Sequence, residues 1–146
     1  MELSDHLIDY IRENAGEPSG DKEHKKLVTD ISNNLGIIGI DDYITIYNEV
    51  GLIKNKRLVR KPDLIVILAN DLYVIEGKVL RGSNIGATKK KLNLQLKTAY
   101  NFFKEYFDIA PRLVGIYRYG NGNKIHHYEL EKGNIEDKIW DHDFIT

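Results

Sequence analysis

The fold of this chain is decided by residues 58–80, which read LVRKPDLIVILANDLYVIEGKVL. Two runs rich in Val, Ile, Leu and Tyr flank a polar pair at positions 70–71, a pattern typical of a β-hairpin. If the loop is this pair, or is wider by one residue on each side, the numbers of facing residues sum to 141. Asp63 then faces Lys78, and Glu76 lies diagonally opposite Asp63.

This register brings three charged side chains to one patch of the hairpin. Glu76 and Lys78 are two positions apart and share a face of their strand, and facing residues share a face as well. Opposed side chains in an antiparallel pair begin about 5 Å apart, and diagonal ones about 7–8 Å apart. The carboxylates of Asp63 and Glu76 are therefore expected where a hard cation could bridge them. A three-residue loop would remove this arrangement, because it turns Asp63 to the opposite face.

The placement of these charges favours a catalytic use. Charges on a mostly apolar strand pair carry a large desolvation cost unless they are paired or bound to a metal. Two carboxylates can hold Mg²⁺, which polarises a phosphate and lowers the pKa of a bound water, and a nearby lysine can orient that water. The trio therefore favours phosphodiester hydrolysis. The alternative is an ion-paired patch on a solvated face of the hairpin.

The hairpin carries a pattern that resembles the signature of the PD-(D/E)xK nuclease superfamily: Pro62-Asp63, twelve residues, and then Glu76-Gly77-Lys78. This superfamily includes restriction endonucleases and archaeal Holliday-junction resolvases. The string alone is short. Its context is more specific, because a strand opens at the Asp, a tight turn follows, and the Glu-x-Lys ends the second strand.

The order of the expected elements also resembles this superfamily. Periodicity and turn signals predict helices over 3–13, 21–35 and 88–107, and strands over 43–50, the two halves of the hairpin, 111–119 and 124–130. Residues 21–119 then correspond to an αβββαβ core. The resemblance implies an α/β fold with a restriction-endonuclease-like core, in which helices flank a central mixed sheet.

The resemblance also implies roles for the residues of the signature. Asp63 and Glu76 are expected to bind Mg²⁺ together with the carbonyl of Gly77, and Mn²⁺ is expected to substitute. Lys78 is expected to position the attacking water. No small-molecule cofactor is expected.

A third acid often joins such sites from the helix before the sheet, and Glu23 is the best match here. Glu23 lies one turn before the apolar Leu27. The alternative is that Glu23 is a first-turn acid favoured by the helix dipole. Glu49, near the end of the preceding strand, is a weaker candidate for the same role. His24 is expected to be a surface or packing residue.

Gln95 resembles the helical Gln that follows Glu-x-Lys in several nucleases of this type, with Lys91 as its neighbour. The familiar Gln-x-x-x-Tyr spacing is off by one, since the tyrosine is Tyr100. Only Gln95 is therefore assigned a catalytic role, and packing is the expected role of Tyr100.

Basic residues concentrate around the expected site. Between Lys54 and Lys104 there are twelve Lys or Arg and three acids, a net charge of +9, whereas the rest of the chain has nine basic and nineteen acidic residues, a net charge of −10. A positive field around a carboxylate site suits a polyanion. The alternative is that the lysine runs are solvated faces. The residues expected to contact DNA are Lys54, Lys56, Arg57, Arg60, Lys61, Arg81, Lys89, Lys90 and Lys91.

Length and composition bound these expectations. The 146 residues are most simply one domain, and the 42% hydrophobic and 29% charged fractions are globular values. The chain has no cysteine, no basic-then-apolar leader and no apolar run approaching about 18 residues, so we expect a cytoplasmic protein without a membrane span.

The sequence therefore predicts a Mg²⁺-dependent endonuclease that acts on DNA. This length leaves no room for a separate specificity domain, which favours a homodimer that cuts duplex or branched DNA. Restriction-type, phage-type and junction-resolving enzymes are not separated, because they share the fold. The alternative function is a non-catalytic module that binds nucleic acid or protein.

Overall fold

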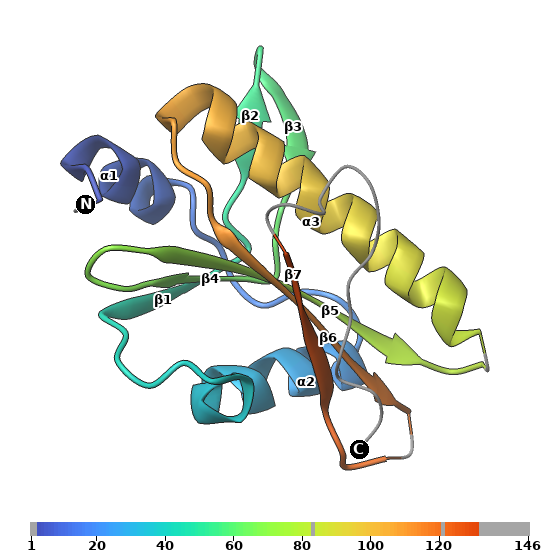
Figure 1. Ribbon diagram of the computed structural model, residues 1–146. Coiled ribbons are helices and arrows are strands. Elements are labelled where there is room, and N and C mark those ends of the chain that lie inside the picture. Colours follow the sequence, from blue (N-terminus) through green and yellow to red (C-terminus); the bar gives the residue numbers. More distant parts are fainter. Residues whose placement is uncertain (1–2, 83, 121, 132–146) are drawn as a thin grey trace.

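A mixed five-stranded sheet forms the centre of the computed structural model (Figure 1), which describes residues 3–82, 84–120 and 122–131. The strand order is β1-β4-β5-β6-β7, with antiparallel pairs except for β5 and β6, which are parallel. The strands are β1 (Thr45–Asn48), β4 (Leu64–Ile67), β5 (Leu72–Leu80), β6 (Arg112–Tyr119) and β7 (His126–Leu130). The prediction of an α/β fold with a central mixed sheet is confirmed.

The central hairpin forms between β4 and β5, but its predicted register is wrong. Leu64 pairs with Ile75, so facing residues sum to 139 rather than 141. The cause is the position of the loop, which comprises residues 68–71 and is therefore centred one residue earlier than expected. A shift of two keeps every side chain on its predicted face. Continued by one residue, the register brings Asp63 opposite Glu76 instead of opposite Lys78.

A second, two-stranded sheet lies between β1 and β4 in the sequence and was not predicted. It consists of β2 (Leu52–Lys54) and β3 (Arg57–Arg60). Residues 54–57 form the tip of this hairpin, where Asn55 and Lys56 have φ angles of 51° and 65°. Two central residues with positive φ fit a tight hairpin turn. Leu58 and Val59, expected in the first strand of the central hairpin, belong to β3.

Helices cover both faces of the sheet, as expected. The helices are α1 (Asp5–Glu13), α2 (Lys22–Ser32) and α3 (Ile85–Phe107), and a 3-10 helix, η1, spans Leu35–Ile38. The α3 helix begins earlier than predicted because Asn84, not Thr88, accepts the capping hydrogen bond. The α2 helix ends earlier, since Asn33 terminates it. In the described part of the chain, no helix is long and apolar enough to cross a membrane.

The two faces of the sheet bury separate apolar clusters. On one face, Ile65 and Val74 pack with buried side chains of α1 and α3. On the other face, Leu64 and Ile75 pack with α2. The alternation of adjacent residues between the two clusters is the two-residue period of a strand. The sheet is therefore held between α2 on one side and α1 with α3 on the other (Figure 1).

The acidic tail lies almost wholly outside the described residues. The sequence does not decide whether this tail, which carries Trp140, docks on the body or on a second subunit, and residues 132–146 are not described.

Candidate functional site

The site lies where β5 extends past its neighbour β4. Pairing between these strands stops at Leu64 and Ile75, so the segment Glu76–Leu80 continues beside β6 alone among the described strands. This leaves one edge of β5 open next to the Glu-x-Lys residues. Gly77 suits the position, because a Cβ there would lie 3.0 Å from Ile116 and 3.3 Å from Leu27 of α2. The missing side chain lets α2 pack close to the open edge.

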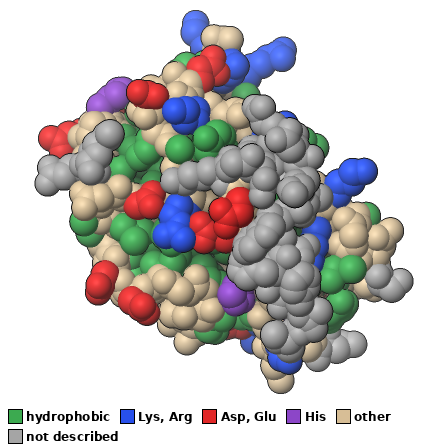
Figure 2. All heavy atoms as spheres, in the orientation of Figure 1, with side chains coloured by type: hydrophobic (Ala, Val, Ile, Leu, Met, Phe, Trp, Pro, Cys, Tyr) green, Lys and Arg blue, Asp and Glu red, His purple; other side chains and the backbone are tan. Residues whose placement is uncertain are grey.

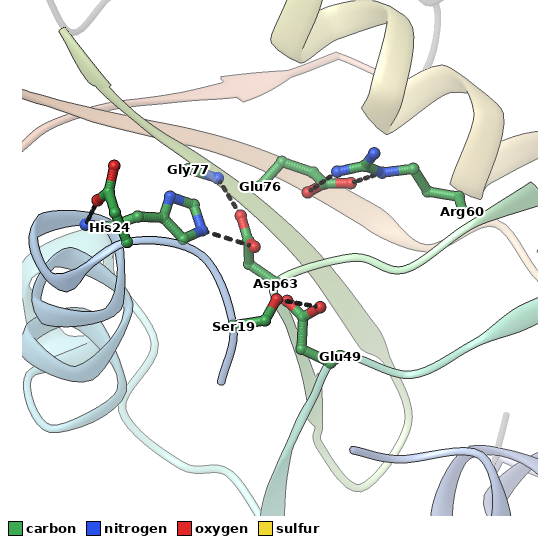
Figure 3. A network of polar contacts seen from close by, with 8 residues as sticks. Ser19, His24, Glu49, Arg60, Asp63, Glu76 and Gly77 are labelled. Atoms are coloured by element: carbon green, nitrogen blue, oxygen red, sulfur yellow. Dashed lines mark hydrogen bonds and ion pairs between the residues drawn. The ribbon is translucent and has the colours of Figure 1, made fainter. Parts of the chain in front are cut away.

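Asp63 binds this open edge directly. Its side chain is 6% exposed, and its Oδ2 accepts a hydrogen bond of 2.8 Å from the backbone N–H of Gly77. Its Oδ1 lies 3.0 Å from Nε2 of His24 on α2 (Figure 3). The contact with Asp63 raises the pKa of the His24 imidazole, against the effect of burial. Asp63 therefore joins the second helix to the Glu-x-Lys strand.

Glu76 is fully buried and bound by an arginine. Nε and Nη2 of Arg60 donate to the two oxygens of Glu76 at 2.6 and 2.9 Å (Figure 3). Burial raises the pKa of Glu76 to about 7, although the hydrogen bonds from Arg60 act in the opposite direction. The charge of Asp63 adds to the increase. Glu76 thus lies beside a like charge.

The third acid of the cluster is Glu49, not the predicted Glu23. Glu49 is 7% exposed, its backbone N–H donates to the carbonyl of Asp63 at 3.3 Å, and its carboxylate accepts from Ser19 at 2.8 Å. Burial raises the pKa of Glu49, and the charge of Asp63 raises it further. Its φ of 47° is costly for a residue with a side chain, about 1–3 kcal/mol, and such strain often marks functional positions.

Glu23 lies apart from the cluster in the first turn of α2, which is the position described by the alternative interpretation of this acid. Its side chain is 49% exposed and lies 3.6 Å from Arg81, in a separate groove that also includes Gly120. Adjacent residues on a helix differ in direction by about 100°. His24 takes the direction expected of Glu23. It was predicted to be a surface or packing residue, and this is wrong because its ring nitrogen contacts Asp63.

Lys78 is the part of the signature that faces a groove. A groove of about 280 Å³ is lined by Gly20, Asp21, His24, Lys78, Val79 and Arg81. A second groove, of about 320 Å³, lies between the end of β5 and the start of α3, and Lys78 and Lys91 both line it. Burial, and then the charge of Lys91, lower the pKa of the Lys78 amine. Lys78 therefore lies between the acid cluster and solvent.

The predicted DNA contacts divide into three groups. Lys56, Arg57, Lys61, Lys90 and Lys91 are exposed. Lys54 pairs with Glu105 at 3.1 Å, Arg81 pairs with Asp21 at 2.8 Å, and Lys89 lies over the rings of Tyr117 and Tyr128. The partly exposed Arg60 binds the buried Glu76. Figure 2 shows basic side chains at the top of the molecule, where the β2–β3 hairpin projects.

Gln95 is not brought into the cluster by any contact with the described residues. Its half-buried side chain lies one turn after Lys91 on α3, and it makes no hydrogen bond or ion pair within the described part of the chain. Its predicted role therefore remains a prediction. Lys91, its expected neighbour, is the member of this pair that interacts with Lys78.

The side chains of the site are of the chemical type that binds a hard divalent cation. Three carboxylates, those of Glu49, Asp63 and Glu76, are buried here, and carboxylate oxygen is the ligand that Mg²⁺ prefers. Within residues 3–82, 84–120 and 122–131, no three acidic or histidine side chains are arranged to hold a metal ion. Both oxygens of Glu76 are bound to Arg60.

The contacts of Arg60 and His24 with the acids of the site were not predicted from the sequence. A signal for His24 was present in Gly20, whose φ is 95° and whose Cβ, if it had one, would lie 2.9 Å from the His24 ring. Arg60 stands three positions before Asp63, at the end of a basic run. Neither signal is specific without the fold.

Comparison with protein-family models, with curated proteins and with solved structures finds no match to this chain.

Proposed function

We propose that this protein is a Mg²⁺-dependent endonuclease that hydrolyses phosphodiester bonds in DNA. The observation that carries the proposal is the burial of Glu49, Asp63 and Glu76 in one cluster at the open edge of β5, with Lys78 in the adjoining groove. Buried like charges raise the free energy of the folded protein, so their convergence is expected where a cation is used.

The topology supports a restriction-endonuclease-like core. A helix (α2) precedes the antiparallel strands β1, β4 and β5, and α3 then leads to β6, which is parallel to β5. This order resembles the αβββαβ arrangement of the PD-(D/E)xK superfamily, with the β2–β3 hairpin inserted after the first strand. Asp63 directly precedes the second core strand, β4, and Glu76 and Lys78 lie in the part of the third, β5, that extends past β4.

The metal would be held by Asp63, Glu76 and the carbonyl of Gly77, with His24 and Glu49 beside them. Bound there, Mg²⁺ would supply charge stabilisation at the phosphate and a more acidic water. Mn²⁺ is expected to substitute, because it also accepts carboxylate and carbonyl oxygens.

Lys78 would orient the attacking water and stabilise charge that develops on the phosphate. Its amine lies in the groove next to the acids, and its lowered pKa helps it to exchange a proton with that water. The nearby Lys91 would contact a neighbouring phosphate.

DNA would lie along the basic side of the molecule, in contact with Lys56 and Arg57 at the tip of the β2–β3 hairpin and with Lys61, Lys90 and Lys91 nearer the groove. A two-stranded ribbon is narrow enough for the major groove of B-DNA. We propose that a homodimer presents two such sites to duplex or branched DNA.

A non-catalytic DNA-binding module is the second candidate, favoured by one observation. Arg60 occupies both oxygens of Glu76, which is how a purely structural acid is satisfied. Such a module would need the basic residues and would not need a divalent cation.

A plasmid-nicking assay tests the proposal. Wild-type protein is expected to nick supercoiled DNA with Mg²⁺ and not with EDTA. Asp63→Ala is expected to lower the rate by about a thousandfold or more, as for other residues that act as a catalytic unit. Asp71→Ala is the matched control, because Asp71 lies at the other end of the same hairpin and accepts a hydrogen bond from Leu72.

Two results would contradict the catalytic proposal. Nicking that persists in EDTA or in Asp63→Ala would exclude the mechanism, and tight DNA binding without cleavage would favour the module. Linear, nicked, flapped and four-way substrates would then define the substrate class.

A further inference from the structure

The strongest unexplained feature of the site is the link between Arg60 and Glu76. A single guanidinium engages both carboxylate oxygens, at 2.6 and 2.9 Å. The Glu76 side chain is 0% exposed, whereas the Arg60 side chain is 27% exposed. The arginine therefore reaches a buried acid from a position that remains open to solvent.

Arg60 lies on an element that is separate from the main sheet. It is the last residue of β3, in a two-stranded hairpin outside the main sheet, and a short segment joins it to Asp63. The exposed Lys56 and Arg57 are on the same hairpin. A rotation of this one long side chain would uncover Glu76 without any change in the sheet.

A divalent cation and the Arg60 guanidinium would compete for the same two oxygens. Glu76 cannot serve as a metal ligand while both oxygens are bound to Arg60, and a buried carboxylate without any cation is strongly unfavourable. If the metal replaces the Arg60 guanidinium, Glu76 is free to bind the metal and is never left without a cation. A guanidinium released in this way suits phosphate, which it binds in the same two-pronged geometry as carboxylate.

We propose that Arg60 is the resident counter-cation of Glu76, that a divalent metal displaces it, and that its guanidinium then binds a phosphate of the DNA. This inference rests on the proposed nuclease function. In this scheme Arg60 neutralises the charge of Glu76 in the metal-free protein. Metal binding then frees Arg60 to contact the DNA.

The affinity for Mn²⁺, measured without DNA by the loss of the free-ion signal in electron paramagnetic resonance, tests the exchange. Arg60→Gln removes the competitor, so it is expected to bind Mn²⁺ about tenfold more tightly than wild type, or more. Arg60→Lys keeps the charge and loses the two-pronged contact, so its affinity is expected to rise as well.

A control variant separates exchange from the general loss of an arginine–glutamate pair. Arg112→Gln removes a second two-pronged pair, which lies at the start of β6, opposite Tyr73 near the other end of β5. This variant is expected to bind Mn²⁺ within about twofold of wild type. Wild-type or weaker affinity in both Arg60 variants would overturn the exchange.

Folding is followed in the same samples by circular dichroism. Arg60→Gln is expected to melt at a lower temperature than wild type in EDTA, and Mn²⁺ is expected to raise its Tm by more than it raises the Tm of wild type. Arg60 variants that fold with Mn²⁺ but not in EDTA would support the exchange. Variants that fold in neither condition would overturn it, because the pair would then be structural.

DNA affinity tests the second half of the proposal. With Ca²⁺ in place of Mg²⁺, Arg60→Gln is expected to bind a fluorescent duplex several-fold more weakly than wild type, with a smaller dependence on salt concentration. Unchanged DNA affinity would overturn the phosphate contact. Asp63→Asn separates a failure of the proposed metal site from a failure of the Arg60 exchange. If Asp63→Asn binds Mn²⁺ as tightly as wild type, the proposed metal site is wrong. If Asp63→Asn binds Mn²⁺ more weakly but the Arg60 variants bind it as wild type does, only the exchange is wrong.

Discussion

Two arginine–glutamate pairs in this molecule have the same local geometry and opposite surroundings. Arg60 donates to Glu76 at 2.6 and 2.9 Å, and Arg112 donates to Glu129 at 2.8 and 2.8 Å. The Glu76 side chain is 0% exposed, whereas the side chains of Arg112 and Glu129 are 39% and 31% exposed. Pairing geometry alone therefore does not distinguish a functional acid from a structural one.

The neighbours of each pair make the distinction. Glu76 lies beside Asp63, and their like charges oppose each other. Arg112 and Glu129 lie on the neighbouring strands β6 and β7, and the guanidinium stacks 4.7 Å from the centre of the Tyr73 ring. The surface pair is complete in itself. The buried pair belongs to a group of three buried carboxylates, and such a group is expected where a cation is used.

The largest expected difference between the two pairs is in DNA cleavage. Glu76→Gln keeps the size of the side chain and removes its charge, so it is expected to lower the rate of Mg²⁺-dependent nicking by about a thousandfold or more. Glu129→Gln makes the same chemical change and is expected to leave the rate within about threefold of wild type. Single-turnover nicking of a plasmid measures both. Equal losses in the two variants would remove the functional distinction.

The next difference is in the pH dependence of stability. The folded-state pKa of Glu76 is about 7, above its ordinary 4.5, so protonated Glu76 stabilises the folded protein. This contribution to the free energy of unfolding is fully present below about pH 4.5 and is lost as the pH rises through 7. A shift of this size corresponds to about 3 kcal/mol. Glu76→Gln cannot titrate, so wild type is expected to lose about this much stability relative to the variant between pH 4.5 and 8.

Urea denaturation in EDTA at several pH values measures this change, with Glu129→Gln as the baseline for a variant outside the acid cluster. A difference between wild type and Glu76→Gln that is constant with pH, or that grows in favour of wild type as pH rises, would contradict the prediction. Such a result would mean that the ion pair with Arg60 stabilises ionised Glu76 by more than burial destabilises it.

The features that sequence analysis predicted correctly depend on local patterns. Two apolar runs around a polar pair indicated the hairpin, and an error of two in the register left Asp63 and Glu76 on the same side. Helical periodicity within residues 88–107 indicated α3. Such signals hold because each is set by neighbours within a few positions.

The features that it missed depend on contacts between distant segments. Glu23 and His24 differ by one step around α2, and only the packing of that helix on the sheet decides which one meets Asp63. Arg60 reaches Glu76 from a separate hairpin whose existence the sequence did not indicate. The basic run at 54–61 was therefore treated as one surface, although one member binds a buried acid.

The smallest expected effect is the coupling free energy between Arg112 and Glu129, with which the coupling free energy between Arg60 and Glu76 can be compared. A double-mutant cycle of Arg112→Gln and Glu129→Gln, measured by urea denaturation, is expected to give a coupling free energy of about 1 kcal/mol or less, because both side chains are partly solvated. The corresponding cycle of Arg60→Gln and Glu76→Gln is expected to give a larger value in EDTA, since loss of one partner leaves the other without its counter-charge in a buried site. A coupling at Arg112–Glu129 as large as that at Arg60–Glu76 would show that burial does not separate the two pairs, and the case for a dedicated cation site would lose its energetic basis.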